Sequence, residues 1–591
     1  MVPKNLRPLV PYLKRYRSGL FWGGLCVLFN NGVWILFPQV IGRAVDALSH
    51  GVTRQKLLTY SLLILTIALI KGIFQFLTRW VVIGISRDIE FDLRNDLFAH
   101  LERLSYSYYQ RNRTGDIMAR ATNDLNAVRM LLGPAIMYSA NTMVFTAGAL
   151  AFMLAISPKL TLYAFLPLPI ASIVIQYFGR RIHERFERIQ AMFSDISARA
   201  QENFSGARVI RAYVQEQAEI SAFENANQEY IRRSLGLVRL MGMLWPTLEL
   251  MLGAAVVIVL WLGGREVLLG KISVGKFVTF NTYMVQLTWP VIALGWVINI
   301  FQRGTASLVR INEIISQQPE IVDESALAFA NGATGEDARL STNIQGEIEF
   351  RNLNFAYNGT SVLKDINLRI PAGSSLAIVG PTGSGKTTLV NLIPRVYDAE
   401  PGNVLIDGRP IREFPLDSLR RHIGFVPQET FLFSDTIREN IAFGAEDATL
   451  GDVRRAAEAA NIAADIEDFP DGYNTVVGER GLTLSGGQKQ RTAIARAVIR
   501  NPRILVLDDA LASVDTQTED RILNHLREIM RGRTTIFISH RVSTVRNADR
   551  IAVLHDGEIV EYGTHDELIT RDGYYTELYN KQLLEEELET V

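Results

Sequence analysis

Long apolar stretches dominate the first half of the chain, whereas the second half alternates between short aliphatic runs and polar segments. A helix needs about 20 mostly apolar residues to cross the hydrocarbon core of a bilayer. The stretches that meet this requirement predict six membrane-spanning helices, at residues 19–41, 58–84, 131–157, 160–179, 241–263 and 274–301. Buried helices of a large soluble protein are the alternative, but six such runs at regular intervals favour a membrane domain.

The connections between the predicted spans differ in length and charge. Those between the second and third spans and between the fourth and fifth are long and rich in arginine, and the others are short with few basic residues. Because basic residues accumulate on the cytoplasmic side, we expect the long connections and both termini in the cytoplasm. The basic segment 1–18 has no apparent cleavage site, so the first span is expected to remain uncleaved.

Inside the predicted spans, the charged residues Lys71 and Glu249 stand out. A charge within the membrane is costly and tends to face a cavity or a partner. The alternative is that each side chain extends to the interface or pairs with a neighbouring helix, and both interpretations stay open. Aromatic residues near the last span could line a substrate cavity or pack against lipid: Phe277, Phe280, Tyr283 and Trp289.

Length, charge and cysteine content narrow the classes of function. At 591 residues the chain is too long for one ordinary domain. Its formal net charge of −1 lacks the basic footprint of a nucleic-acid-binding protein, so no nucleic acid is expected as a partner. Cys26 is the single cysteine, which excludes a disulfide or a cysteine-ligated metal site within the chain. Residues 323–345 are small, acidic and turn-forming, and they predict a linker.

A phosphate-binding motif follows this linker. The apolar run LAIV leads into GPTGSGKT, which matches the pattern G-x-x-x-x-G-K-[ST] in full. The glycines let backbone N–H groups surround a phosphate, and the next helix presents its positive N-terminal end. Lys386 would contact the β- and γ-phosphates of ATP, and Thr387 would ligate Mg²⁺. The predicted ATP-binding residues here are Gly380, Pro381, Thr382, Gly383, Ser384, Gly385, Lys386, Thr387 and Thr388.

Two adjacent carboxylates follow a second aliphatic run, in ILVLDDALASVD. Asp508 occupies the position where a P-loop protein holds Mg²⁺. Asp509 follows, where a carboxylate could orient the attacking water. The predicted fold is therefore multi-domain, with an all-α polytopic membrane domain (19–322) carrying long cytoplasmic extensions, followed by an α/β P-loop NTPase domain. The domain spans 346–580, and an acidic tail occupies 581–591.

Between these motifs lies LSGGQ, and with it the second half of the chain resembles the nucleotide-binding domain of an ATP-binding cassette (ABC) transporter. LSGGQ is that family's signature, formed here by Ser485, Gly486, Gly487 and Gln488 after Leu484. The family's other motifs match Tyr357 for stacking on adenine, Gln428 for the Q-loop, Gly478 to Arg480 for the motif before the signature, Asp515 for the D-loop and His540 for the switch histidine. The resemblance implies catalytic roles for Asp509, Gln428 and His540, with Gln428 also close to Mg²⁺.

The membrane half resembles the same family. Residues 112–124 and 202–216 look like the two intracellular coupling segments of exporters in which six spans precede the nucleotide-binding domain. The resemblance implies that the chain is half of a transporter. Two nucleotide-binding domains would pair head to tail, so that each ATP lies between the phosphate-binding loop of one chain and the signature of the other.

One position departs from the family pattern. Most members have glutamate after the metal-binding aspartate, whereas this chain has Asp509, which is one methylene shorter. A carboxylate misplaced by about 1 Å can slow the reaction ~10²-fold, so this site is expected to hydrolyse ATP poorly. The signature is intact and would serve the partner's site. The chain thus resembles the degenerate-site subunit of heterodimeric bacterial multidrug or lipid exporters, although a homodimer stays possible.

The function implied is ATP-driven export of hydrophobic or amphipathic compounds across the bacterial inner membrane, with ATP and Mg²⁺ as cofactors. The expected partners are a second ABC half-transporter chain, the lipid bilayer and a small amphipathic substrate. The alternative hypotheses are an importer built on the exporter fold, a homodimeric lipid or peptide transporter, an ATP-gated channel, and a soluble ABC ATPase. The six predicted spans count against the last of these.

Overall fold

The computed structural model describes residues 4–589 except 324–343, 446, 479–480, 482, 511–521, 523–529 and 540. The chain divides into two compact units. The first comprises Met1–Leu101 and Gly115–Ser316, and the second comprises Glu102–Thr114 and Gln317–Val591. Most of the predicted linker lies outside the described residues.

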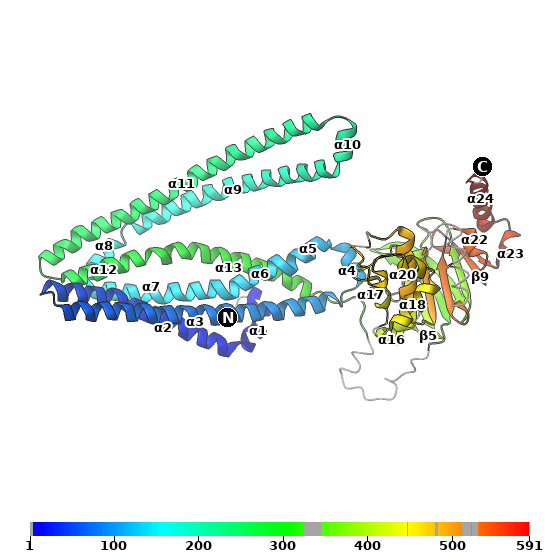
Figure 1. The fold of residues 1–591 in the computed structure, drawn as a ribbon, viewed down its shortest axis with the longest axis horizontal. Helices are drawn as coiled ribbons and strands as arrows, with labels where there is room; N and C mark the ends of the chain where they lie inside the picture. Colours follow the sequence, from blue (N-terminus) through cyan, green and yellow to red (C-terminus); the bar gives the residue numbers. More distant parts are fainter. Residues whose placement is uncertain are drawn as a thin grey trace. The chain divides into compact units, whose positions relative to one another are not determined.

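The described residues of the first unit form helices joined by turns, and α2 and α3 pack along each other (Figure 1). Its elements are η1 (Lys4–Leu9), α1 (Val10–Arg15), α2 (Arg17–Ser49), α3 (Arg54–Leu101), α5 (Thr114–Ala119), η2 (Arg120–Asp124), α6 (Leu125–Met130), η3 (Leu131–Ala135), α7 (Ile136–Ile156), α8 (Pro158–Ala164), α9 (Leu168–Ser205), α10 (Ala207–Ala212), α11 (Glu216–Leu268), α12 (Val274–Gln286) and α13 (Thr288–Ile315). The elements from α5 to α7 form one continuous helix with two π-helical turns, and Pro134 lies in the second of these turns. A proline has no N–H to donate, so a local change in the helical hydrogen-bond pattern is expected there.

Five helices among the described residues are long and apolar enough to cross a membrane. They are Arg17–Ser49, Arg54–Leu101, Thr114–Ile156, Glu216–Leu268 and Val274–Ile315. These match five of the six predicted spans. The predicted span 160–179 differs, because it is divided between α8 and α9 at Phe165–Pro167. Pro167 and Pro169 lack the N–H groups that would continue a helix across this point.

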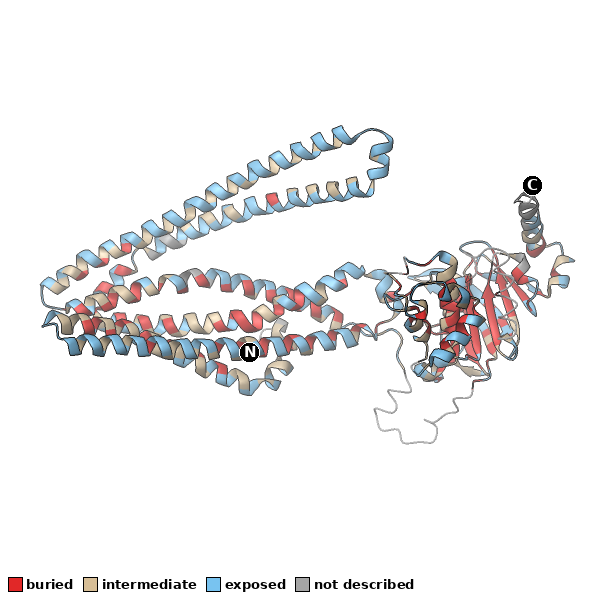
Figure 2. Cartoon of the chain, in the orientation of Figure 1, coloured by how far each residue is buried: buried red, intermediate tan, exposed pale blue. Residues whose placement is uncertain are grey.

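Apolar side chains face outward along the helices of this unit. On α3 the exposed side chains include Leu65, Leu69, Phe76 and Trp80. Figure 2 shows the contrast with the sheet of the second unit, whose strands are largely buried. Apolar exposure sustained over the length of a span is expected where the surrounding medium is lipid rather than water.

A long helical hairpin projects away from the other helices of the first unit (Figure 1). The helices α9 and α11 pack along each other, and α10 joins them. The predicted coupling segment 202–216 lies at the end of the hairpin where α10 connects the two long helices. Apolar side chains are exposed along it: Phe186, Phe193, Phe204, Ile231 and Leu235.

The second unit contains two sheets. A four-stranded antiparallel sheet has the order β2-β1-β4-β5, and a six-stranded sheet has the order β10-β9-β3-β8-β7-β6. The strands are β1 (Ile348–Tyr357), β2 (Thr360–Ile370), β3 (Ser375–Val379), β4 (Val404–Ile406), β5 (Arg409–Pro410), β6 (Ile423–Val426), β7 (Ile504–Asp508), β8 (Thr534–Ile538), β9 (Arg550–His555) and β10 (Glu558–Gly563). In the larger sheet β9, β3, β8, β7 and β6 are parallel, so the loops that follow them leave from one edge.

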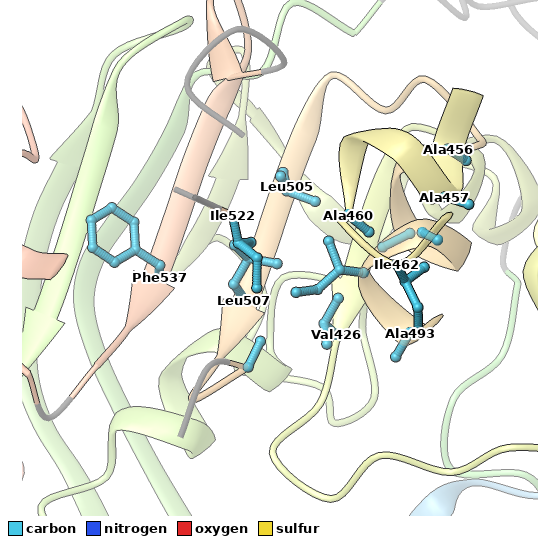
Figure 3. Packing of buried hydrophobic residues seen from close by; sticks show 14 of the residues in the cluster. Val426, Ala456, Ala457, Ala460, Ile462, Ala493, Leu505, Leu507, Ile522 and Phe537 are labelled. Atoms are coloured by element: carbon cyan, nitrogen blue, oxygen red, sulfur yellow. The ribbon is translucent and has the colours of Figure 1, made fainter. Parts of the chain in front are cut away.

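The helices of the second unit cover these sheets. They are α4 (Tyr106–Arg111), α15 (Lys386–Asn391), η5 (Ile411–Glu413), α16 (Leu416–Arg421), α17 (Ile437–Ala442), α18 (Leu450–Ala459), α19 (Ala463–Glu467), η6 (Gly472–Asn474), α20 (Gly486–Val498), α22 (Val542–Val545), α23 (His565–Ile569) and α24 (Tyr574–Glu589). Every residue of β7 is buried, which explains its unbroken aliphatic run. Figure 3 shows Leu505 and Leu507 of this strand in one apolar cluster with Ala493 of α20 and Ala457 of α18.

Candidate functional site

The glycine-rich loop after β3 has a backbone that a larger residue would not tolerate. Gly380, Gly383 and Gly385 have φ angles of +148°, +85° and +102°, which L-residues with a side chain rarely adopt. A Cβ on Gly380 would lie 2.0 Å from the carbonyl oxygen of Leu554. A Cβ on Gly385 would lie 2.8 Å from Cδ2 of Leu363. The loop therefore keeps a narrow backbone cradle at the start of α15.

Lys386 begins α15 and is buried. Its ammonium Nζ donates to the carbonyl oxygens of Gly380 and Pro381, both at 2.8 Å. Burial lowers the pKa of Lys386, while Asp509 and Asp508 nearby favour its charged form. The cation is thus held over the cradle, where it can contact an anion.

Ser384 supplies a second sign that this loop accepts a ligand. Its hydroxyl is buried and has no hydrogen-bond partner among the described residues. An unpaired buried hydroxyl is unfavourable, and a phosphate oxygen would pair with it. The cradle, the buried cation and this hydroxyl together fit the phosphates of ATP.

Asp508 and Thr387 come together as the motifs predict. The Thr387 hydroxyl donates to Oδ1 of Asp508 at 3.2 Å, and Asp508 is almost fully buried. Burial is the main cause that raises the pKa of Asp508 to about 6, with Asp509 adding to the effect and the Thr387 hydrogen bond opposing it. A hydroxyl and one carboxylate beside a phosphate cradle are oxygen ligands that suit Mg²⁺, which commonly completes its shell with water and phosphate.

Asp509 lies directly after β7 in an unusual backbone conformation. Its φ is +48°, in the left-handed region that aspartate enters more readily than most residues. Its N–H donates to the carbonyl oxygen of Ile538 on the neighbouring strand β8, at 3.1 Å. This hydrogen bond ties the backbone of Asp509 to the sheet beside the phosphate cradle.

Gln428 lies at the same edge of the six-stranded sheet as Asp508, but its side chain does not contact the predicted Mg²⁺ ligands. It is exposed and lies two residues after β6, which pairs in parallel with β7. Its side chain makes no hydrogen bond to Thr387 or Asp508 in the part of the chain that the structure describes. The predicted Asp515, His540, Glu479 and Arg480 lie outside the described residues.

Tyr357 ends β1 beside the phosphate loop. Its hydroxyl donates to Oγ1 of Thr388 at 3.3 Å. Its ring packs edge-on against Phe355 and Tyr397, with centroids 5.0 and 5.1 Å away. The structure therefore places the predicted adenine-stacking residue next to the phosphate cradle, within an aromatic cluster.

This cluster includes residues that sequence analysis missed. The Tyr397 hydroxyl donates to Oε1 of Gln110 at 2.8 Å, and the Tyr397 ring packs edge-on against that of Tyr106. Burial raises the pKa of Tyr397 to about 12. The helix α4 thus contacts the aromatic cluster from a position just before the predicted coupling segment 112–124. The aromatic run YSYY at 106–109 was the available signal.

The signature lies at the start of α20. The Ser485 hydroxyl accepts from the Gln488 N–H at 3.2 Å, and Oε1 of Gln488 accepts from the Ser485 N–H at 3.0 Å, forming a capping box. Ser485 and Gly486 are exposed. Among the described residues, no hydrogen bond joins the signature to the phosphate loop of the same chain. The signature is ordered by its own helix and open to another molecule.

Comparisons with known proteins agree with this arrangement. The family models for the ABC transporter transmembrane region and the ABC transporter match residues 20–291 and 363–512. A probable multidrug resistance ABC transporter ATP-binding/permease protein of Bacillus subtilis is 38% identical over 94% of this chain and 94% of its own length. An ATP-dependent lipid A-core flippase of Syntrophus aciditrophicus is 37% identical over 95% of this chain and 92% of its own.

A solved structure extends the similarity to three dimensions. The structure of a bacterial Atm1-family ABC exporter with ATP bound is 31% identical and has a TM-score of 0.76. The match covers 96% of this chain and 98% of that one. With its helical membrane unit, its phosphate cradle beside Asp508 and its exposed signature, the chain belongs to the ABC exporter half-transporters, which function as dimers and couple ATP hydrolysis to transport.

Proposed function

We propose that this chain is one half of a heterodimeric exporter of hydrophobic or amphipathic compounds in a bacterial inner membrane. The observation that carries the proposal is the separation of two half-sites. The phosphate loop meets Asp508 in the interior of the domain, while the signature on α20 is exposed. Such half-sites are complementary when two domains pair head to tail. The names of relatives, a multidrug resistance protein and a lipid A-core flippase, support the substrate class.

Each residue of the phosphate-binding half-site has a proposed role. The loop amides, Ser384 and Lys386 bind the phosphates, and Tyr357 stacks on adenine. Thr387, Asp508 and Gln428 would hold Mg²⁺, which supplies charge neutralisation at the β- and γ-phosphates. The second carboxylate, Asp509, would orient water, with the predicted switch residue His540 and with Gln428 assisting. The predicted Asp515 would contact nucleotide across the dimer.

Asp509 supports the heterodimer. Its carboxylate is one methylene shorter than that of glutamate, and its backbone is held by the Ile538 hydrogen bond. A shift of about 1 Å away from the water can slow hydrolysis ~10²-fold. A homodimer would carry this weakness in both sites. A partner with glutamate at the equivalent position would have one fast site, completed by Ser485 and Gly487 of this chain.

The exposed apolar side chains of the α9–α10–α11 hairpin support a dimer as well. They include Phe186 and Phe193 on α9, and Ile231 and Leu235 on α11. Aromatic and aliphatic side chains gathered on a helix pair are the composition of a protein interface core. The positive-inside tendency of the long arginine-rich connections supports a cytoplasmic location for both the hairpin end and the nucleotide-binding domain.

The test is transport by the complex in inside-out vesicles. Genes beside this one are the first source of a partner, and the co-purified pair is expected to accumulate an amphipathic dye in the vesicles only with ATP. The chain alone is expected to hydrolyse ATP slowly. ATP-dependent loss of dye would indicate an importer, and rapid hydrolysis by the chain alone would contradict the heterodimer. ATP-dependent ion current without accumulation would indicate a channel.

A further inference from the structure

A cavity with a mixed polar and apolar lining lies among the helices of the first unit. Its volume is about 380 Å³, and it is lined by residues of α2, α3, α7, α12 and α13. The lining contains five amide side chains and two threonine hydroxyls, and its charged residues are Lys71 and Arg79. No acidic residue lines it among those that the structure describes. The cavity is within the size range of small-molecule sites.

Lys71 is the more unusual of the two cations. It occupies the middle of the predicted span 58–84, about 20 Å of helix from either end at 1.5 Å per residue. A lysine side chain does not reach the interface from there. Its Nζ lies 3.5 Å from the centroid of the Trp34 ring. A cation–π contact holds the ammonium in place but leaves its charge without a counter-ion.

Arg79 lies on the same helix, eight residues further, and lines the same cavity. In an α-helix residues spaced by about two turns return to one face. In the described chain neither Arg79 nor Lys71 forms an ion pair with a carboxylate. The cavity therefore presents two positive charges and no compensating negative charge from its own lining.

Further polar atoms of the lining have no partner. The Thr78 hydroxyl, Oδ1 of Asn30 and Oε1 of Gln286 are buried without a hydrogen bond among the described residues. Thr78 is only 2% exposed. By contrast, Asn141 is fixed, since its Oδ1 accepts from Nδ2 of Asn31 at 2.7 Å. Unpaired buried polar atoms are unfavourable, and a polar ligand would pair with them.

We propose that this cavity binds the acidic headgroup of an amphipathic anion, with Lys71 and Arg79 as its counter-ions. The Thr78 hydroxyl donates to the headgroup, and the oxygens of Asn30 and Gln286 accept from hydroxyl or N–H groups of the same ligand. Phe145, Trp289 and Pro290 on the lining contact its apolar part. A cationic compound would add a third positive charge to the cavity. This inference rests on the proposed export function and names its substrate class.

The experiment uses the complete transporter in nanodiscs of phosphatidylcholine, which carries no net charge. An alkyl phosphate with a diazirine in its chain serves as the photolabel, and labelled peptides of this chain are quantified by mass spectrometry. Dodecyl phosphate, dodecanoate and dodecyltrimethylammonium compete with it, so the alkyl chain is constant and the headgroup varies. Lys71→Gln and Arg79→Gln each remove one charge, and Lys71→Arg restores it. Arg54→Gln, at the start of the same helix and away from the cavity, is the matched control.

We expect labelling of α2, α3 or α7, with both anions competing at concentrations about tenfold lower than the cation. Losing one hydrogen-bonded charge should weaken competition by dodecyl phosphate about tenfold in Lys71→Gln and Arg79→Gln, while Lys71→Arg and Arg54→Gln resemble the wild type. Competition by the phosphate but not the carboxylate supports the proposal and narrows the headgroup. Equal competition by the cation, or unchanged labelling in both glutamine variants, overturns it.

Failure of this inference is distinguishable from failure of the proposed function. A wild-type complex that accumulates a neutral or cationic dye with ATP, yet shows equal competition by all three headgroups, retains the function and loses the inference. A wild-type complex that neither hydrolyses ATP nor accumulates any compound contradicts the function itself.

Discussion

The phosphate loop and the signature are the two proposed half-sites for ATP, yet the domain builds them in opposite ways. The loop follows a buried strand, and in the interior Lys386 donates to the loop's own carbonyl oxygens while the Thr387 hydroxyl donates to Asp508. The signature rests on a capped helix whose first residues face outward. In the proposed head-to-tail dimer, the loop would bind nucleotide with groups from one chain, whereas the signature would act on nucleotide held by the other chain. Substitutions in the two regions should separate binding from turnover.

The largest effect is expected from Gly487→Asp in this chain. The carboxylate would face the γ-phosphate held by the partner, and losing preorganised donors of this kind slows turnover by ~10²–10³-fold. The measurement is ATPase activity of the co-purified complex, with photolabelling by azido-ATP showing that this chain still binds nucleotide. Asp509→Asn is the control and should change turnover only modestly. Equal loss in both variants would mean that the two sites depend equally on this chain's carboxylate.

Asp508→Asn should instead weaken Mg²⁺-dependent nucleotide binding at the phosphate loop of this chain. It removes the negative charge that would balance Mg²⁺, and the loss of a charged interaction of this strength corresponds to about 10–100-fold weaker binding. Azido-ATP labelling of this chain should lose its dependence on Mg²⁺, while labelling of the partner persists. Labelling with an unchanged Mg²⁺ requirement would place the metal on other residues.

The same carboxylate predicts a pH dependence. Burial raises the pKa of Asp508 to about 6, so the side chain is ionised above this pH and takes up a proton below it. A proton and Mg²⁺ compete for the carboxylate, and Mg²⁺-dependent nucleotide binding by this chain should weaken up to about tenfold for each pH unit below 6. Titrating azido-ATP labelling against pH, with and without chelator, gives the measurement. The Asp508→Asn variant should show no such step.

Tyr357→Ala should weaken ATP binding by this chain about tenfold, since stacking on a base contributes about 1–3 kcal/mol. Tyr357→Phe keeps the ring and loses only the hydrogen bond to Thr388. It should bind almost as tightly as the wild type. The measurement is the dissociation constant of a fluorescent ATP analogue. A large loss in the phenylalanine variant would assign the effect to the hydroxyl rather than to stacking.

The smallest effect is expected at the contact between the aromatic cluster and α4. Tyr397→Phe removes the hydrogen bond to Gln110, worth about 1 kcal/mol, so exchange of α4 amides with deuterium should rise about fivefold. Amides of α20 should exchange as before. Tyr106→Phe, which changes an exposed residue of the same cluster, serves as the control. Unchanged exchange of α4 in Tyr397→Phe would show that ring packing alone holds this helix.

Sequence predicts best what is local. The phosphate loop was predictable because its glycines and Lys386 are adjacent, and the pairing of Thr387 with Asp508 followed from two strand ends. The contact of Tyr397 with Gln110 was not predictable, because 287 residues separate them and neither position has a motif. The break between α8 and α9 was missed because hydropathy over 160–179 is high throughout and does not register the missing N–H groups of Pro167 and Pro169. The cavity charge at Lys71 was noted, but the lack of a counter-ion required the packed helices.

The lack of space for a Cβ at Gly380 limits which mutations can change ATP hydrolysis without abolishing ATP binding. A side chain there collides with the Leu554 carbonyl oxygen, so substitution removes the nucleotide-binding fold of the loop in a single step. Position 509 allows the rate of ATP hydrolysis to change by degrees, because aspartate and glutamate differ by one methylene on a backbone outside the cradle. Once two genes encode the two chains, a single-base codon change in one of them can therefore slow ATP hydrolysis at one site while both sites still hold nucleotide. An asymmetric transporter is thereby one substitution away from a pair of duplicated genes.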